Sequence, residues 1–318
     1  MRVRFWGTRG SIPVALTSAD IRDKLAQALL AASGRRFDSP GAAYDFASEH
    51  LPFSVTHTFG GHTSCVELEN GRNEYFVCDM GSGARAFGAH VLAREGGRPA
   101  TINVFMSHVH WDHIMGFPFF GPAYVPGMQI RIHGCHDILE QAFRQQQSAP
   151  CFPVDFDQLA AAIEFVKLAP GETREVCGMA VTPKLQRHSG DSFGYRFEAG
   201  GRSVVYSTDS EHTLDNPSET ATFVAFFRDA DLVIFDAMYS LAEAVSVKAD
   251  WGHSSNIIGV ELCQMAKAKH LMLFHHEPAN DDAILEGVLR DARRLEELTR
   301  EGHTLRVSAA YDGLEIAL

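Results

Sequence analysis

The sequence predicts an α+β protein in which two packed β-sheets are flanked by helices. Apolar residues make up 45% of the 318 residues, which is enough to form a substantial buried core. Short apolar runs typical of strands follow one another in meanders, with amphipathic helical segments inserted between them. No repeat, low-complexity segment or linker divides the chain, so we expect a single domain spanning residues 1–318.

The hydrophobic pattern places the expected elements along the chain. Strands are expected at residues 2–6, 66–68, 75–78, 102–106, 129–132, 180–185, 192–198, 203–207, 232–235 and 270–274. Helices are expected at residues 17–33, 137–147, 254–269 and 281–299. Residues 14–58 form an expected insertion, in which a polar surface loop at residues 34–58 follows the first helix. We expect this insertion to cover the active site or to form the contact of a homodimer.

The composition argues against several classes of partner. The formal net charge is −12, which disfavours a broad basic surface for nucleic acid. No segment has the roughly 20 consecutive apolar residues that cross a bilayer, and the N-terminus does not resemble a secretory signal. The six cysteines are scattered without a CxxC pair, as expected for free thiols in a reducing compartment. We therefore expect a cytoplasmic protein without a membrane partner.

Four candidate metal ligands lie within six residues: His108, His110, Asp112 and His113. They follow the apolar run at 102–106, so a turn at the end of a buried strand can gather them around one point. Imidazole and carboxylate groups suit zinc, and also manganese or iron. The alternative is a surface loop that happens to be rich in histidine, but an HxHxDH pattern after a buried strand favours a metal site.

Three further polar residues, each just past an apolar strand, supply the ligands that a second metal requires. They are His188, Asp209 and His275. The ends of neighbouring strands meet at one rim of a sheet, where these side chains can gather. His276 is the alternative to His275, which we prefer because it follows the apolar strand directly.

The order HxHxDH, then His, then Asp, then His resembles the metallo-β-lactamase superfamily over nearly the whole chain. The resemblance implies a four-layer αββα sandwich with two divalent metal ions, preferably zinc, at one edge. It assigns His108, His110 and His188 to one metal, Asp112, His113 and His275 to the other, and Asp209 to both. Asp79, in an Asp-x-Gly-x-Gly stretch, matches the aspartate that braces the metal loop in this family.

Two features indicate a branch of this superfamily. His110 stands where oxidoreductase members carry a glutamate, which favours hydrolysis. The stretches at residues 7–13 and 60–65 resemble ribonuclease Z and related phosphodiesterases, although His62 stands where that branch usually has asparagine.

Catalytic and substrate-binding residues are implied by the same resemblance. Asp236 and His253 are similar to the acidic residue and the histidine of ribonuclease Z-like enzymes. Asp236 would orient His253, and His253 would protonate the leaving group. The residues assigned to catalysis are therefore Asp112, His253 and Asp236. Arg9, Arg187 and His212 are candidates for contact with the substrate, and Glu211 is a further one.

We therefore expect a dinuclear metal-dependent hydrolase, most specifically a phosphodiesterase for small phosphodiesters such as cyclic nucleotides. The metals would activate a water for in-line attack on phosphorus. The alternatives are a hydrolase of thioesters, lactones or β-lactams, and an RNA-processing enzyme similar to ribonuclease Z. RNA is disfavoured because we find no Lys/Arg-rich, Gly-rich insertion to grip it. The complete ligand set argues against a third reading, a non-catalytic metal-binding module.

Overall fold

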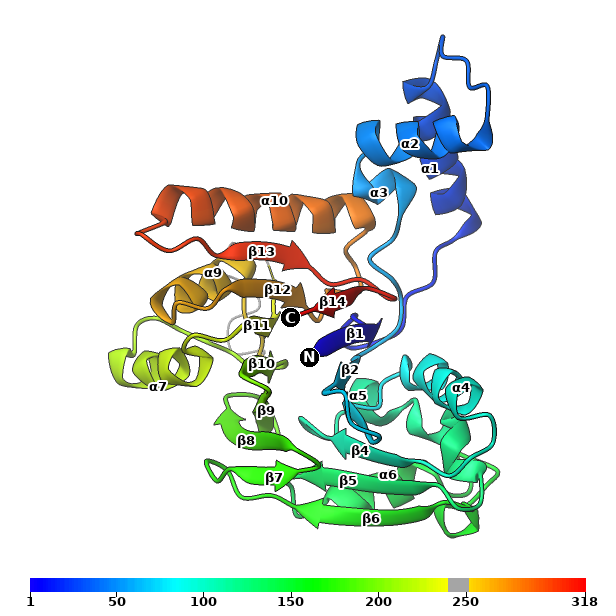
Figure 1. Ribbon diagram of the computed structural model, residues 1–318, viewed down its shortest axis with the longest axis vertical. Helices are drawn as coiled ribbons and strands as arrows, with labels where there is room; N and C mark the ends of the chain where they lie inside the picture. The colour runs from blue at the N-terminus through cyan, green and yellow to red at the C-terminus, as the bar shows by residue number, and fades with distance from the viewer. Residues whose placement is uncertain (240–251) are drawn as a thin grey trace.

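Two seven-stranded sheets form the centre of the computed structural model, which describes residues 1–239 and 252–318 (Figure 1). In spatial order, the first sheet consists of β14 (Glu315–Ala317), β1 (Arg2–Gly7), β2 (Cys65–Glu69), β3 (Tyr75–Cys78), β4 (Thr101–Phe105), β5 (Gln129–Gly134) and β6 (Ala162–Lys167). The second consists of β13 (Arg306–Ala309), β12 (His270–Phe274), β11 (Leu232–Asp236), β10 (Arg202–Ser207), β9 (Ser192–Ala199), β8 (Met179–Gln186) and β7 (Arg174–Val176). Each sheet contains both parallel and antiparallel pairs.

Helices cover the outer face of each sheet (Figure 1). Those on the first sheet are α4 (Ala84–Glu95), α5 (Trp111–Ile114) and α6 (Leu139–Gln146). Those on the second sheet are α7 (Pro217–Phe227), α9 (Asn256–Met265) and α10 (Asp282–Thr299). A third buried cluster joins the two sheets, where the rings of Phe5 and Phe274 lie 6.1 Å apart. This order of helix, sheet, sheet and helix confirms the predicted αββα sandwich.

The insertion at residues 14–58 is more helical than predicted. The expected first helix is present as α1 (Ser18–Ala31), but α2 (Pro40–His50) and α3 (Phe53–Thr56) replace the expected loop. Pro40 stands in the first turn of α2, where its missing N–H is not needed, and the Ser39 hydroxyl caps that helix. Proline therefore begins a helix here instead of breaking one, and the prediction of a loop was wrong.

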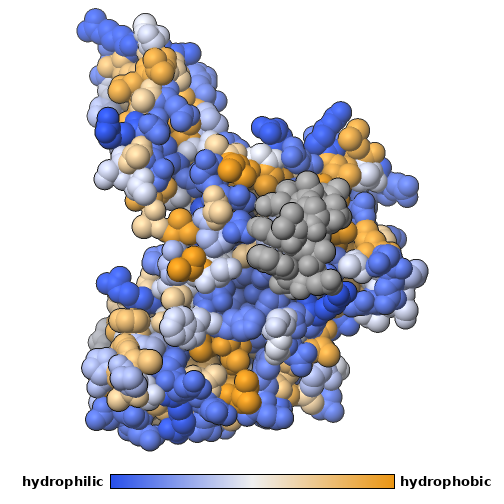
Figure 2. Space-filling view, turned by 180° about the vertical axis from the view of Figure 1, so that it is seen from behind, coloured by the Kyte–Doolittle hydropathy of each residue, from blue (hydrophilic) through white to orange (hydrophobic). Residues whose placement is uncertain are grey.

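The three helices of the insertion form an arm that extends away from the two sheets (Figure 1). α1 has no buried residue, and Leu25, Leu29 and Leu30 are 58%, 72% and 76% exposed. Figure 2 shows apolar side chains gathered on the surface of this arm. A homodimer contact or a cover for the active site stays a prediction, and these leucines are the residues that a contact would bury.

Two expectations drawn from composition can be compared with the structure. Among the residues that it describes, no helix has the length and apolar character needed to span a bilayer. All six cysteines are unpaired, and four of them are buried. The cytoplasmic location stays a prediction.

Candidate metal centre

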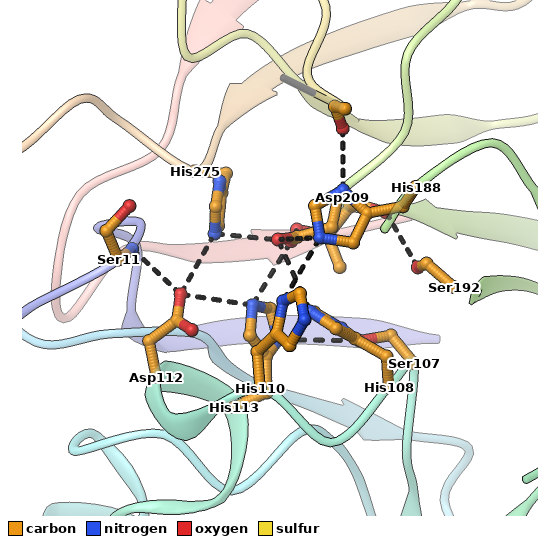
Figure 3. A network of polar contacts seen from close by, with 12 residues as sticks. Ser11, Ser107, His108, His110, Asp112, His113, His188, Ser192, Asp209 and His275 are labelled. Carbon is orange, nitrogen blue, oxygen red and sulfur yellow. Dashed lines mark hydrogen bonds and ion pairs between the residues drawn. The ribbon is translucent and has the colours of Figure 1, made fainter. Parts of the chain in front are cut away.

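The loop after β4 carries four predicted ligands to one rim of the sandwich. α5 begins directly after His110, and its single turn places Asp112 and His113 in buried positions. Of the groups of side chains whose ligand atoms lie within 4.8 Å of one another, two consist of predicted ligands alone: His108, His110 and His188, and Asp112, His113, Asp209 and His275. Figure 3 shows these side chains converging from the two sheets. The structure thus brings all seven predicted ligands together. His275, which we preferred over His276 as a ligand, lies in the cluster.

Three of the residues at this rim have a backbone conformation that non-glycine residues rarely adopt. Asp79, Asp209 and His275 have φ angles of +59°, +46° and +60°. Each comes one or two residues after a strand. A left-handed φ costs on the order of 1–3 kcal/mol and is concentrated at functional sites. At each of these three positions the left-handed conformation turns the chain sharply at the end of a strand, and the side chain points to the rim from this turn.

The spacing of the second ligand group fits one tetrahedral ion. Asp209 Oδ1 lies 3.1 Å from His113 Nε2 and 3.2 Å from His275 Nε2. Asp112 Oδ2 lies 3.3 and 3.4 Å from the same two nitrogens. Ligand atoms about 2.0–2.1 Å from a tetrahedral zinc ion are about 3.3 Å from one another. The four side chains therefore have the separations that a shared ion requires.

The first ligand group is joined to the second through Asp209. His188 Nε2 lies 3.2 Å from His110 Nδ1. The other oxygen of Asp209, Oδ2, lies 3.6 Å from His108 Nε2 and 3.8 Å from His188 Nε2. Each oxygen of this carboxylate thus faces a different group, as expected of a ligand that bridges two ions.

Three buried ring nitrogens in the cluster lack a hydrogen-bond partner in the described part of the chain: Nε2 of His108, Nε2 of His113 and Nδ1 of His275. A buried polar atom without a partner is costly, unless a ligand completes it. Burial and the neighbouring His113 lower the pKa of His108 well below its usual range, so His108 is neutral, the form that binds a metal. The donor set therefore fits divalent cations.

Asp79 braces the ligand loop from below. Its Oδ2 lies 2.8 Å from His113 Nδ1 and accepts hydrogen bonds from the hydroxyls of Ser107 and Tyr206, both at 2.7 Å. Its Oδ1 accepts the backbone N–H of Ser107. Because the carboxylate holds Nδ1–H, His113 Nε2 is left for the metal. Asp79 is thus a support for the ligands, as its resemblance implied.

His188 is oriented by a backbone carbonyl. His188 Nδ1 lies 2.8 Å from the carbonyl oxygen of Gly252, to which it donates its proton, so Nε2 faces the other ligands. Gly252 has a φ of +81°, and a Cβ atom there would lie 2.4 Å from His188 Nδ1. No side chain larger than hydrogen fits this position.

Gly252→Ala is expected to weaken metal binding by the first ligand group about 10- to 100-fold, because it displaces His188. Gly171→Ala is the matched control: Gly171 also has a φ of +81°, but a Cβ atom there meets nothing within 4 Å. Competition with a zinc indicator measures the affinity. Equal losses in both variants would attribute the effect to backbone strain and not to His188.

His276 points away from the cluster. Its Nε2 donates to the carbonyl oxygen of Ala310 at 2.8 Å. Burial lowers the pKa of His276 to about 3, so its ring is neutral and supports the backbone.

His253 and Asp236 form a second polar pair beside the ligands. His253 Nδ1 lies 2.8 Å from Asp236 Oδ2, and Asp236 also accepts the backbone N–H groups of Ser210 and Met238. The His253 ring stacks on that of His275, with centroids 5.1 Å apart. Burial acts to lower the pKa of His253, but the charge and hydrogen bond of Asp236 outweigh it and raise the pKa to about 9.

Two of the residues predicted to contact the substrate, Arg9 and His212, are buried and pack within the protein instead. Arg9 is 3% exposed, and its guanidinium donates to the carbonyl oxygens of Gly60, Glu277 and Asn280. Such a guanidinium holds three loops together and is not available to a phosphate. We therefore correct the assignment of Arg9 as a substrate contact.

His212 is likewise part of the core. Its ring lies 4.3 Å from that of Phe223 and 5.2 Å from that of Phe235, and burial lowers the pKa of His212 to about 3. Its assignment as a substrate contact is also corrected. Arg187 differs, because its side chain is 49% exposed and lies 3.7 Å from Glu211. Contact of Arg187 or Glu211 with a substrate stays a prediction.

The loop after β1 contributes contacts that the sequence analysis did not assign. The backbone N–H of Ser11 donates to Asp112 Oδ2 at 2.8 Å. At Gly10, a Cβ atom would lie 2.6 Å from His275 Cε1. The stretch at residues 7–13 was noticed as a motif, but the need for glycine beside a ligand is visible only when the distant segments are folded together.

Comparison with known proteins places this site in a family. Residues 75–276 match the family described as the β-lactamase superfamily domain. A ribonuclease Z from Oceanobacillus iheyensis is 19% identical over 274 residues, which are 70% of this chain and 85% of that protein. The metallo-β-lactamase fold protein YhfI from Bacillus subtilis has a TM-score of 0.65 at 17% identity, over 99% of this chain and 98% of YhfI. A diphosphatase of the PhnP family has a TM-score of 0.59 at 18% identity, over 100% and 97% of the two chains.

The αββα sandwich with a cluster of histidine and aspartate ligands at its rim defines a metal-dependent hydrolase. The chain belongs to the metallo-β-lactamase superfamily, as the order of its ligands predicted.

Proposed function

We propose that this protein is a dinuclear phosphodiesterase that acts on small phosphodiesters such as cyclic nucleotides. One observation carries the proposal: the His253–Asp236 pair stands against both ligand groups, with the His253 ring 5.1 Å from the rings of His188 and His275. A proton donor in this place assists a reaction whose leaving group is an alkoxide, as in the hydrolysis of an alkyl phosphodiester.

The ligand groups described above would hold two divalent ions, preferably zinc, with manganese or iron as alternatives. When bound, the ions supply positive charge for the phosphoryl oxygens and activate a water. Asp236 holds His253 through Nδ1, so Nε2 carries the proton that the leaving oxygen takes. Two backbone N–H groups fix Asp236 in turn.

The main alternative is the hydrolysis of a thioester, lactone or β-lactam by the same ligands. A thiolate leaves without a proton, so thioester hydrolysis gains little from the His253–Asp236 pair. The ribonuclease Z and diphosphatase similarities also favour phosphorus over carbon. The net charge of −12 favours a small substrate over RNA, because RNA binding depends on basic groups that neutralise phosphates.

A substrate panel tests this proposal. Protein loaded with zinc or manganese is assayed with bis-p-nitrophenyl phosphate, a cyclic nucleotide, a thioester and nitrocefin. We expect turnover of the two phosphodiesters, and its loss when a chelator removes the metals. Turnover of the thioester or nitrocefin alone would favour the alternative reaction, and turnover of none would favour a non-catalytic module.

A further inference from the structure

A groove outside the metal centre runs between α10 and the edge strands β13 and β14. Its volume is about 950 Å³, within the range of sites for small molecules. Four arginines line it: Arg290, Arg293 and Arg294 on α10, and Arg306 on β13. Figure 1 shows α10 and β13 lying along one side of the second sheet, with β14 close by. None of the predicted ligands or catalytic residues lines this groove.

The groove has a small excess of positive charge, because four arginines line it against three carboxylates, one of which is paired with an arginine outside the groove. Glu286 accepts hydrogen bonds from the Ser54 hydroxyl and the Phe53 N–H. Glu315 pairs with an arginine of β1, and Glu297 pairs with only one of the four groove arginines, at 3.2 Å. Arg290 lies 3.9 Å from Asp291, whereas Arg293 and Arg306 have no carboxylate within ion-pair distance among the described residues.

Two of the groove arginines, Arg293 and Arg306, act on one buried residue of β12, His270. Arg293 Nε donates to the carbonyl oxygen of Val307 at 3.0 Å, which fixes Arg293 against β13. The Arg306 guanidinium makes no hydrogen bond or ion pair with any residue in the described ranges. The positive charges of Arg293 and Arg306 both act on His270. This residue is 5% exposed, and its Nε2 lies 3.0 Å from Ser308 Oγ. Burial and then these two arginines lower the pKa of His270 to about 4.

The part of the groove near α3 is aromatic. The rings of Phe53 and Tyr311 lie 5.1 Å apart at an angle of 50°, and Phe53 also packs on Phe59 at 4.7 Å. Leu289 and Leu314 line the groove as well. The groove thus combines an aromatic and apolar region with a cluster of arginines.

We propose that this groove is a second binding site, for a small phosphorylated ligand with an aromatic body such as a nucleoside monophosphate. Guanidinium groups bind phosphate oxygens through paired, charge-assisted hydrogen bonds, which Arg293 and Arg306 offer. Aromatic side chains provide faces on which a base stacks. This site is separate from the metal centre and does not depend on the reaction catalysed there.

Isothermal titration of the metal-loaded protein with adenosine monophosphate tests the proposal. We expect two classes of site in the unaltered protein, because the metal centre also takes phosphate. Arg306→Gln is expected to weaken one class about ten-fold or more and to leave the other unchanged. This variant removes no side-chain hydrogen bond or ion pair of the described residues, so it should fold normally, and hydrolysis of bis-p-nitrophenyl phosphate should keep its rate.

Arg228→Gln is the matched control, since Arg228 is an exposed arginine at the end of α7, outside the groove. Binding that Arg306→Gln leaves unchanged, or that both variants weaken equally, would overturn the proposal. Inorganic phosphate serves as a second probe. It is expected to bind the groove more weakly than adenosine monophosphate, and equal affinities would contradict the role of the aromatic region.

Discussion

Asp209→Ala is expected to reduce phosphodiesterase activity by a factor on the order of 10³, because this carboxylate is shared by both ligand groups. One of its oxygens lies 3.1 Å from His113 Nε2, and the other lies 3.6 Å from His108 Nε2. Its removal leaves each group one ligand short and takes away the charge that holds two cations close together. Metal content should fall along with activity.

Elemental analysis by mass spectrometry measures the metal bound per chain, and bis-p-nitrophenyl phosphate measures turnover. His276→Gln is a suitable control, because His276 adjoins a ligand but its ring donates its hydrogen bond to the Ala310 carbonyl and not to the cluster. We expect this control to retain its metal. An Asp209→Ala protein with full metal content and near-normal turnover would show that Asp209 does not bridge the two groups.

His253→Ala is expected to slow hydrolysis of a cyclic nucleotide about 10²- to 10⁴-fold, the usual contribution of a general acid. The alkoxide that leaves a cyclic nucleotide needs a proton, whereas p-nitrophenolate is a stable anion. The same variant should therefore lose much less activity with bis-p-nitrophenyl phosphate. Its metal content should not change, because seven other side chains supply the ligands.

The difference between the two substrates is the decisive readout. Asp236→Asn should show the same pattern with a smaller loss, since it disturbs only the orientation of His253. Equal losses with both substrates would contradict the role of His253 as proton donor. Loss of metal would instead make His253 a ligand, for which its position near His188 and Asp209 offers a geometry.

The fold and the ligands were predictable because they rest on local patterns. Apolar runs identified the central strands, and polar residues after four of these runs identified the candidate ligands. The sandwich gathers these strand ends at one rim, which is why Asp209 and His275 meet a loop about 100 or more positions earlier in the chain. The strands and the ligands were therefore predicted from the hydrophobic period together with the type of residue that follows it.

Features that depend on distant partners were not predictable in this way. Arg9 has the chemistry of a phosphate contact, but its three carbonyl partners come from residues 60, 277 and 280. His212 is buried by aromatic residues of α7 and β11, and α7 itself was not expected. The edge strands β7, β13 and β14 are three or four residues long, too short to give a recognisable period.

Anomalous diffraction from crystals of the zinc-loaded protein tests the central claim most directly. We expect two peaks per chain at the rim of the sandwich. One should lie among His108, His110 and His188, and the other among Asp112, His113 and His275, with Asp209 between them. A single peak, or peaks held by other residues, would contradict the dinuclear centre.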